Sequence, residues 1–161
     1  MAILSSEKAI RSLRKTPVLL YALMYGVDQE KARTLRDGAD GWNTLEVVGH
    51  MLDLETSFWD RIRLAVAEVN PHYEKLPYLE WVTTHKYSEQ DLQQVLQAFY
   101  DKRRDFITYL ESLTPEQWAR LGTHPEYGEG TVLDQAVSVA LHDINHIEQL
   151  VRILEYGEAI I

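Results

Sequence analysis

Residues 131–156 read TVLDQAVSVALHDINHIEQLVRILEY, and their apolar positions recur at the spacing of an α-helix. Thr131 is a favoured N-cap residue, Asp134 places a negative charge near the positive end of the helix dipole, and Gly157 is a natural C-terminal stop. The stretch therefore predicts one long amphipathic helix. Its core-facing arc is expected to contain Leu133, Ala136, Ala140, Ile144, Ile147, Leu150, Val151 and Leu154.

Three earlier stretches, residues 6–26, 43–68 and 88–113, show the same periodicity. Pro17 lies inside the first stretch and should break its helix nearby, because proline lacks the N–H of a helical hydrogen bond. We find no alternating strand pattern, internal repeat or low-complexity tract. The pattern predicts an all-α protein, a single domain over residues 1–161 that folds as a four-helix bundle.

Cap signals mark two of these helix starts. Asn43 with Glu46 has the spacing of a capping box, and Ser88 with Asp91 repeats a weaker version of it. The segments between the helices contain proline, glycine and polar residues. They predict loops at residues 29–41, 70–87 and 124–130, and a short helix that begins at Thr114-Pro115.

Composition narrows the function classes. The 161 residues carry a formal net charge of -9 and no cysteine. Without a basic patch, nucleic acid and anionic membranes are not expected partners, and any metal must bind through histidine or carboxylate. The longest apolar run, residues 18–24, is too short to span a bilayer, and the N-terminus lacks the pattern of a signal peptide. We therefore expect a cytoplasmic protein.

Three histidines are the candidate functional residues. His142 and His146 lie one helical turn apart on one face, and His50 lies in another predicted helix. Three imidazoles can hold a metal ion and leave a position open, which is typical of catalytic zinc. Boundary histidines bonded to water or carboxylates are the alternative. Asp143 after His142 departs from the HisGluxxHis metalloprotease motif, and only one Asp-x-x-His spacing is present, which disfavours a di-iron site.

Two segments resemble a known family. Residues 41–51, GWNTLEVVGHM, resemble the first signature of the DinB/YfiT-like superfamily, a helix start with tryptophan that leads to a first histidine. Residues 141–150, LHDINHIEQL, resemble the second signature, His-xxx-His followed by glutamine. The resemblance implies a DinB-like four-helix bundle with an up-down-down-up path, often a homodimer. It also implies one divalent ion per chain (Zn, Ni, Mn or Fe), held by His50, His142 and His146 with water.

The resemblance further implies an enzyme that acts on a small-molecule substrate. The expected activity is either S-transfer dependent on a low-molecular-weight thiol or hydrolysis. The catalytic group would be water or an external thiolate at the open metal position. A non-catalytic metal-binding and dimerising stress-response protein is the alternative, and a plain helical scaffold whose histidines bind nothing is the third hypothesis.

The remaining polar and aromatic residues carry weaker predictions. Glu46, Asp53 and Gln149 lie close enough in sequence to orient the imidazoles, although a capping role or a solvated position is favoured for each one individually. Tyr127 is a candidate to overhang the site from its loop. A surface position is predicted for the following set: His72, His85, His124, Asp101, Arg103 and Arg104. Trp42 is expected to staple the entrance of the second helix.

Overall fold

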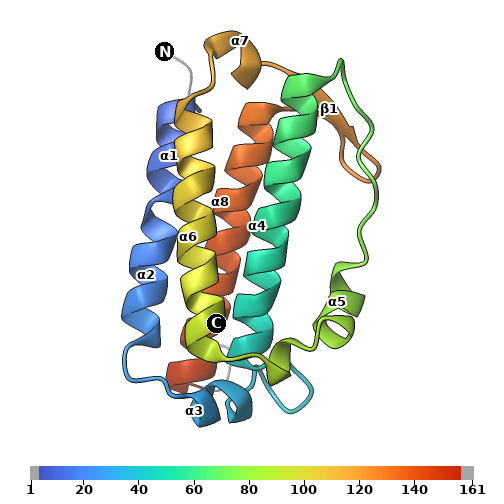
Figure 1. The fold of residues 1–161 in the computed structure, drawn as a ribbon. Coiled ribbons are helices and arrows are strands. Elements are labelled where there is room, and N and C mark those ends of the chain that lie inside the picture. Colours follow the sequence, from blue (N-terminus) through green and yellow to red (C-terminus); the bar gives the residue numbers. More distant parts are fainter. Residues whose placement is uncertain (1–3, 157–161) are drawn as a thin grey trace.

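The computed structural model describes residues 4–156, and four long helical rods form its body (Figure 1). The first rod consists of α1 (Ser6–Leu13) and α2 (Lys15–Met24). The others are α4 (Thr44–Ala67), α6 (Leu92–Glu111) and α8 (Val132–Val151). In Figure 1 the first rod and α8 run downward while α4 and α6 run upward, which confirms the predicted up-down-down-up path.

The helix starts follow from local capping. Asn43 and Glu46 form a complete capping box at α4, and Thr131 and Asp134 form one at α8. The prediction that α6 begins at Ser88 is wrong. Asp91 is its N-cap and accepts a hydrogen bond from Gln94 N at 2.9 Å, because the preceding residues Tyr87–Glu89 form a separate 3-10 turn.

Short elements occupy segments that were predicted to be loops. α3 (Gln29–Thr34) lies below the bundle, and α5 (Tyr78–Thr84) lies on the long connection from α4 to α6. α7 (Pro115–Trp118) is the short helix predicted from Thr114-Pro115. A π-helical turn, Arg152–Tyr156, follows α8, and the predicted stop at Gly157 lies outside the described residues.

A small hairpin precedes α8, so the prediction of a plain loop without strands is wrong. β1 (Leu121–His124) pairs antiparallel with β2 (Gly128–Thr131), with Leu121 opposite Thr131. Each strand has only four residues and β2 contains two glycines, so neither shows a readable alternation. The connection from α4 lies against this hairpin, because Tyr73 N donates to Thr123 O at 2.9 Å.

A buried ion-pair network lies where the first rod breaks. Pro17 has no N–H to donate to Leu13 O, and the guanidinium of Arg103 donates to that carbonyl instead, at 2.9 Å. Arg103 also donates to both carboxylate oxygens of Glu55, each at 2.6 Å, and to Asp143 at 2.7 Å. The predicted surface position of Arg103 is therefore wrong, because its side chain is 1% exposed.

The apolar core lies on both sides of this network. One cluster includes Leu45, Met51 and Phe99, and the other includes Ile62 and Phe106. Most of the predicted arc of α8 faces these clusters. Ile144 was also predicted to be in the core, but it is 51% exposed. The helix is rotated so that Asp143 faces Arg103, and this turns the next residue toward solvent.

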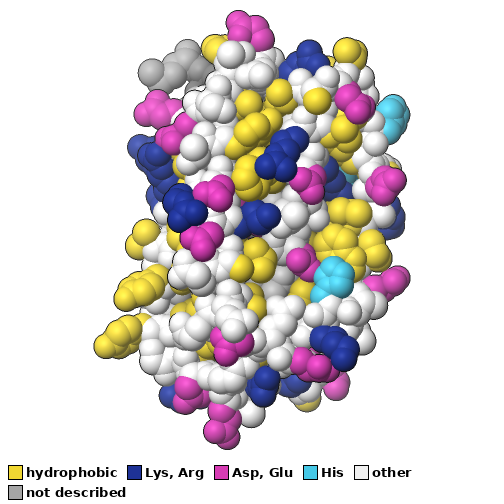
Figure 2. All heavy atoms as spheres, viewed as in Figure 1, with side chains coloured by type: hydrophobic (Ala, Val, Ile, Leu, Met, Phe, Trp, Pro, Cys, Tyr) yellow, Lys and Arg dark blue, Asp and Glu magenta, His cyan; other side chains and the backbone are white. Residues whose placement is uncertain are grey.

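The surface mixes acidic and basic side chains, and hydrophobic side chains project at the lower left edge, where Figure 1 places α2 (Figure 2). Val18 and Tyr21 on α2 are each 68% exposed. Between residues 4 and 156, none of the helices combines the length and the apolar character that crossing a membrane requires.

Candidate metal centre

Two neighbouring helices bring the three predicted histidines together. α4 contributes His50 near its start, and α8 contributes His142 and His146 from consecutive turns. The Nε2 atom of His142 lies 3.1 Å from that of His50 and 3.1 Å from that of His146. One nitrogen from each ring lies within 4.8 Å of the other two. The packing of α4 against α8 therefore converts residues 92 positions apart into one cluster.

Burial keeps these imidazoles neutral. It is the main cause that lowers the pKa of His50 to about 4, with His146 as the next cause. Burial and the two neighbouring histidines lower the pKa of His142 to about 2. Burial also lowers the pKa of His146, against an opposing hydrogen bond to Gln149. Neutral rings present lone pairs, and a lone pair is what a metal ion requires of an imidazole.

The donor set fits a divalent cation. A tetrahedral zinc ion with bonds of about 2.0–2.1 Å to nitrogen holds its ligand nitrogens about 3.3 Å apart, close to the two spacings of 3.1 Å. Gln149 Oε1 lies 2.8 Å from Nδ1 of His146, so this Nδ1 carries the hydrogen and donates it. The lone pair of Nε2 then faces the other two rings. Gln149 is in turn held by Asp37, to which it donates at 3.0 Å.

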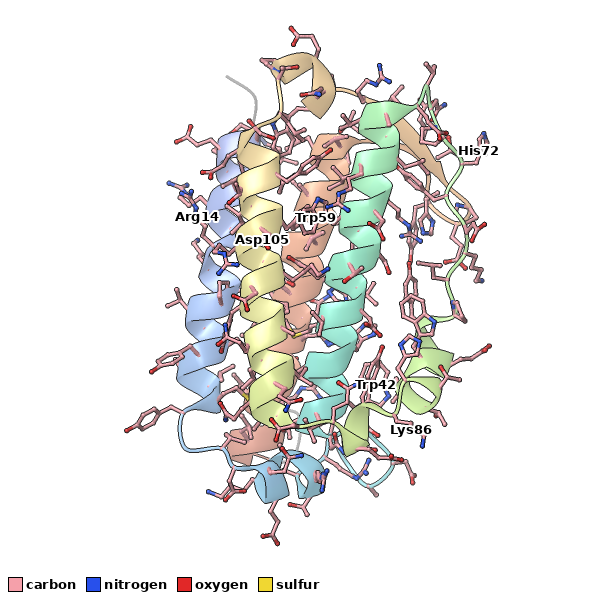
Figure 3. All side chains as sticks on the ribbon, viewed as in Figure 1. Arg14, Trp42, Trp59, His72, Lys86 and Asp105 are labelled. Carbon is pink, nitrogen blue, oxygen red and sulfur yellow. The ribbon has the colours of Figure 1, made fainter. Side chains whose placement is uncertain are left out.

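Trp42, predicted to staple the entrance of α4, also contacts the histidine cluster. Its ring stacks on that of His146, with centroids 6.3 Å apart and planes 10° apart, and it meets His50 edge-on at 5.0 Å. Figure 3 shows this tryptophan near the lower end of α4. It shields one side of the cluster from water, a role that the prediction of a staple did not include. Nδ1 of His50 is buried and has no hydrogen-bond partner among the residues that the structure describes.

The other two candidate orienting residues act elsewhere. Glu46 closes the capping box of α4 and lies 3.4 Å from the guanidinium of Arg36. Asp53 accepts a hydrogen bond from the Tyr87 hydroxyl at 2.5 Å and lies 2.6 Å from Nδ1 of His85. Of the three residues proposed from sequence, only Gln149 contacts a histidine of the cluster.

A cavity of about 630 Å³ opens beside the cluster. His50 and His142 line one part of it, and the hairpin lines another. His124, predicted to be on the surface, is only 8% exposed and lines this cavity. Tyr127 does overhang it, since its ring stacks on that of His124 with centroids 4.6 Å apart and is otherwise 83% exposed.

The sequence interpretation missed Arg61 as a cavity residue and placed His124 on the surface, whereas Tyr78, considered from sequence for a pocket mouth or a dimer contact, does line the cavity. For Arg61 a signal was present. It lies eleven residues after His50, which is three helical turns on the same face of one helix. His124 carried no such signal, because it belongs to a segment outside the long helices.

The sequence profile of the DinB superfamily matches residues 12–150. The chain belongs to this superfamily. Its relatives include YfiT of Bacillus subtilis, named "Putative metal-dependent hydrolase YfiT", which is 26% identical over 151 residues, 91% of this chain and 84% of that one. A protein of Halalkalibacterium halodurans, "Putative metal-dependent hydrolase BH0277", is 26% identical over 147 residues, 87% of this chain and 82% of that one.

The fold is shared with a relative whose structure has been solved. The structure of YfiT from Bacillus subtilis, described as "a probable metal-dependent hydrolase with an unusual four-helix bundle topology", superposes with a TM-score of 0.79 at 24% identity. The superposition covers 94% of this chain and 89% of that chain.

Proposed function

We propose that this protein is a metal-dependent hydrolase of a small-molecule substrate, with one divalent ion held by His50, His142 and His146. The observation that carries the proposal is the convergence of three neutral imidazole nitrogens beside a cavity. Relatives of this chain are named for the same chemistry. A divalent ion in such a site supplies a Lewis acid and lowers the pKa of a coordinated water toward about 7.

The residues around the cluster prepare it for this role. Gln149 fixes the orientation and tautomer of His146, and Trp42 packs against the rings of His50 and His146 outside the cavity lining. Leu54 and Phe58 form an apolar wall one and two turns beyond His50. An apolar wall excludes water from the substrate side and strengthens electrostatic interactions in the site.

Thiol S-transfer, the other expected activity, stays a prediction. It would require an external thiol, since the chain has no cysteine, and no described side chain distinguishes a thiol from water in the cavity. A non-catalytic metal-binding role would use the same three histidines. The open cavity beside them favours an enzyme over that alternative.

The test is the metal content of protein purified without a polyhistidine tag, measured by plasma mass spectrometry after reconstitution with zinc, nickel, manganese or ferrous ion. We expect about one ion per chain in the wild type and none when His50, His142 and His146 are all replaced by alanine. Gln149→Ala should weaken metal affinity by about 10–100-fold, because the orientation of His146 is lost.

Gln97→Ala is the matched control, because Gln97 is exposed on α6. Hydrolysis of a panel of activated esters and amides by the metal-loaded protein then separates an enzyme from a metal-binding protein. A wild type that binds no ion under any of these conditions would end the proposal.

A further inference from the structure

Arg61 is a buried cation without an anionic partner in the protein. It lies on α4, is 7% exposed, and forms no ion pair with any carboxylate of the residues that the structure describes. One of its five N–H groups donates to Glu74 O at 3.1 Å. A buried charge is expensive unless it is paired, so an unpaired guanidinium at this position indicates that the partner is a ligand.

The guanidinium is held in place by aromatic rings. Its central carbon lies 5.9 Å from the ring centroid of Phe58, 5.6 Å from that of Tyr73 and 5.9 Å from that of Tyr78. Cation–π contacts offset part of the desolvation of the charge, but they use the faces of the guanidinium and leave N–H groups at its edge free to bind.

Arg61 and the histidine cluster share one cavity. Both His50 and Arg61 line the cavity of about 630 Å³, together with Leu54 and Phe58 between them. Eleven residues of helix separate their Cα atoms by about 16 Å along the axis. Side chains on a helix lean toward its N-terminus, so the long arginine side chain shortens this distance in the direction of His50.

Two neutral donors lie near this arginine. Among the residues that the structure describes, the buried hydroxyl of Tyr78 has no well-formed hydrogen-bond partner, and Tyr78 lines the same cavity. Nδ1 of His124 accepts hydrogen bonds from Glu126 N at 3.1 Å and Tyr127 N at 3.4 Å, so its hydrogen lies on Nε2. Burial and the charge of Arg61 lower the pKa of His124, which keeps that ring neutral.

The acidic residues of the cavity are already engaged. Glu126 pairs with Lys75 at 2.5 Å, Glu129 accepts from Asn70 at 2.9 Å, and Asp134 caps α8. They do not neutralise Arg61, but three carboxylates around one cavity disfavour a dianion such as a phosphate monoester. A ligand group with one negative charge, such as a single carboxylate, suits the donors around Arg61 and is repelled less by these three carboxylates.

We propose that Arg61 binds a carboxylate at the end of the substrate remote from the bond that is cleaved, with Tyr78 and His124 as additional donors. The inference rests on the proposed hydrolase and names its substrate class: an elongated ester or amide with a terminal carboxylate. Leu54 and Phe58 would contact the apolar middle of such a molecule.

The test uses hydroxamates, which bind the metal ion of metallohydrolases, as probes of the zinc-loaded protein by titration calorimetry. The acidic probes are the monohydroxamates of succinic, adipic and suberic acid, and the neutral probes are alkyl hydroxamates of matched length. At the chain length that fits best, we expect the acidic probe to bind at least about tenfold more tightly than the neutral probe. A charge-assisted hydrogen bond to Arg61 supplies a difference of this size. Arg61→Gln should remove this preference, and Arg61→Lys should retain part of it.

Arg63→Gln is the matched control. Arg63 follows two residues later on α4, its side chain is 52% exposed, and it contacts Trp59 and Asp60 outside the cavity. Retained affinity for the neutral probe shows that the Arg61 variants keep the site intact. Equal affinity of acidic and neutral probes for the wild type would overturn this inference alone. Failure of every hydroxamate to bind would overturn the proposed function and this inference with it.

Discussion

Replacing Arg103 by methionine is expected to destabilise the bundle more than any surface substitution, because it leaves two buried carboxylates without their cation. Glu55 is 1% exposed and Asp143 is 3% exposed. Arg103 also supplies the hydrogen bond that Leu13 O lacks because of Pro17. Breaking a buried ion pair from one side reduces the free energy of unfolding by about 3–5 kcal/mol. A domain of this kind has about 5–15 kcal/mol in total, so the variant should be marginally stable.

The loss should also depend on pH in a defined direction. Burial raises the pKa of Glu55 even though Arg103 opposes that rise. Without Arg103 the folded-state pKa moves further above the unfolded value of about 4.3. A carboxyl group whose pKa is raised in the folded state holds its proton more tightly there than in the unfolded state. The variant therefore recovers stability as the pH falls through the folded-state pKa of Glu55 toward the unfolded value. The difference from wild type is therefore expected to be smaller at pH 5 than at pH 8.

The assay is urea unfolding of the metal-free proteins, followed by circular dichroism at both pH values. Arg104→Met is the control, because Arg104 is the next residue, its side chain is 66% exposed, and its ion pairs within the described part of the chain are with Asp101 and Asp105 on the surface. Its free energy of unfolding should match that of the wild type. The assigned cost of buried unpaired charge would be refuted by either of two results: a decrease in the free energy of unfolding of Arg103→Met of less than about 1 kcal/mol, or an equal decrease at both pH values.

Two further predictions follow from the histidines and from the exposed apolar groove. Because the pKa values of His50 and His142 are lowered to about 4 and about 2, the metal-free protein should lose stability as the pH falls below about 6.5, by up to about 1.4 kcal/mol per histidine at pH 5.5. The triple alanine variant should show a shallower slope, to which His124 still contributes; equal slopes for the two proteins would contradict the prediction. The homodimer stays a prediction from the family resemblance. Leu141, 60% exposed, lines an apolar groove with Leu19 and Ile144, so we propose this groove as the dimer contact and expect Leu141→Asp to halve the mass measured by light scattering; a mass equal to that of the wild type would contradict this site.

The long helices and the histidine cluster could be predicted because their signals are local. Asn43 and Thr131 cap α4 and α8 through residues three positions away, and His142 and His146 share a face by helical geometry alone. The hairpin and α5 could not be predicted in the same way. Their strands and turns are short, and contacts far apart in sequence, such as Tyr73 N with Thr123 O, determine where they lie.

Arg103 shows how a readable signal can be missed. It lies four residues after Phe99 and three before Phe106, so helical spacing places it on the buried stripe of α6. Arg103 and Arg104 carry the same charge and were both predicted to lie on the surface. Their positions on the helix differ, so that Arg103 is buried and Arg104 is exposed. The partner that allows burial, Glu55, is 48 residues away and becomes visible only in the fold.

The same network explains why aspartate follows the first histidine of the HisxxxHis pair. Successive residues on a helix point about 100° apart, so His142 and Asp143 face different neighbours. His142 faces His50 on α4, while Asp143 accepts hydrogen bonds from Arg103 on α6, at 2.7 Å, and from the Thr16 hydroxyl on α2, at 2.6 Å. Its carboxylate is therefore held in the core and is not available as a general base beside the histidines. In this chain the residue that a metalloprotease helix would use for catalysis instead fixes the rotation of α8, and that rotation is what directs His142 and His146 toward His50.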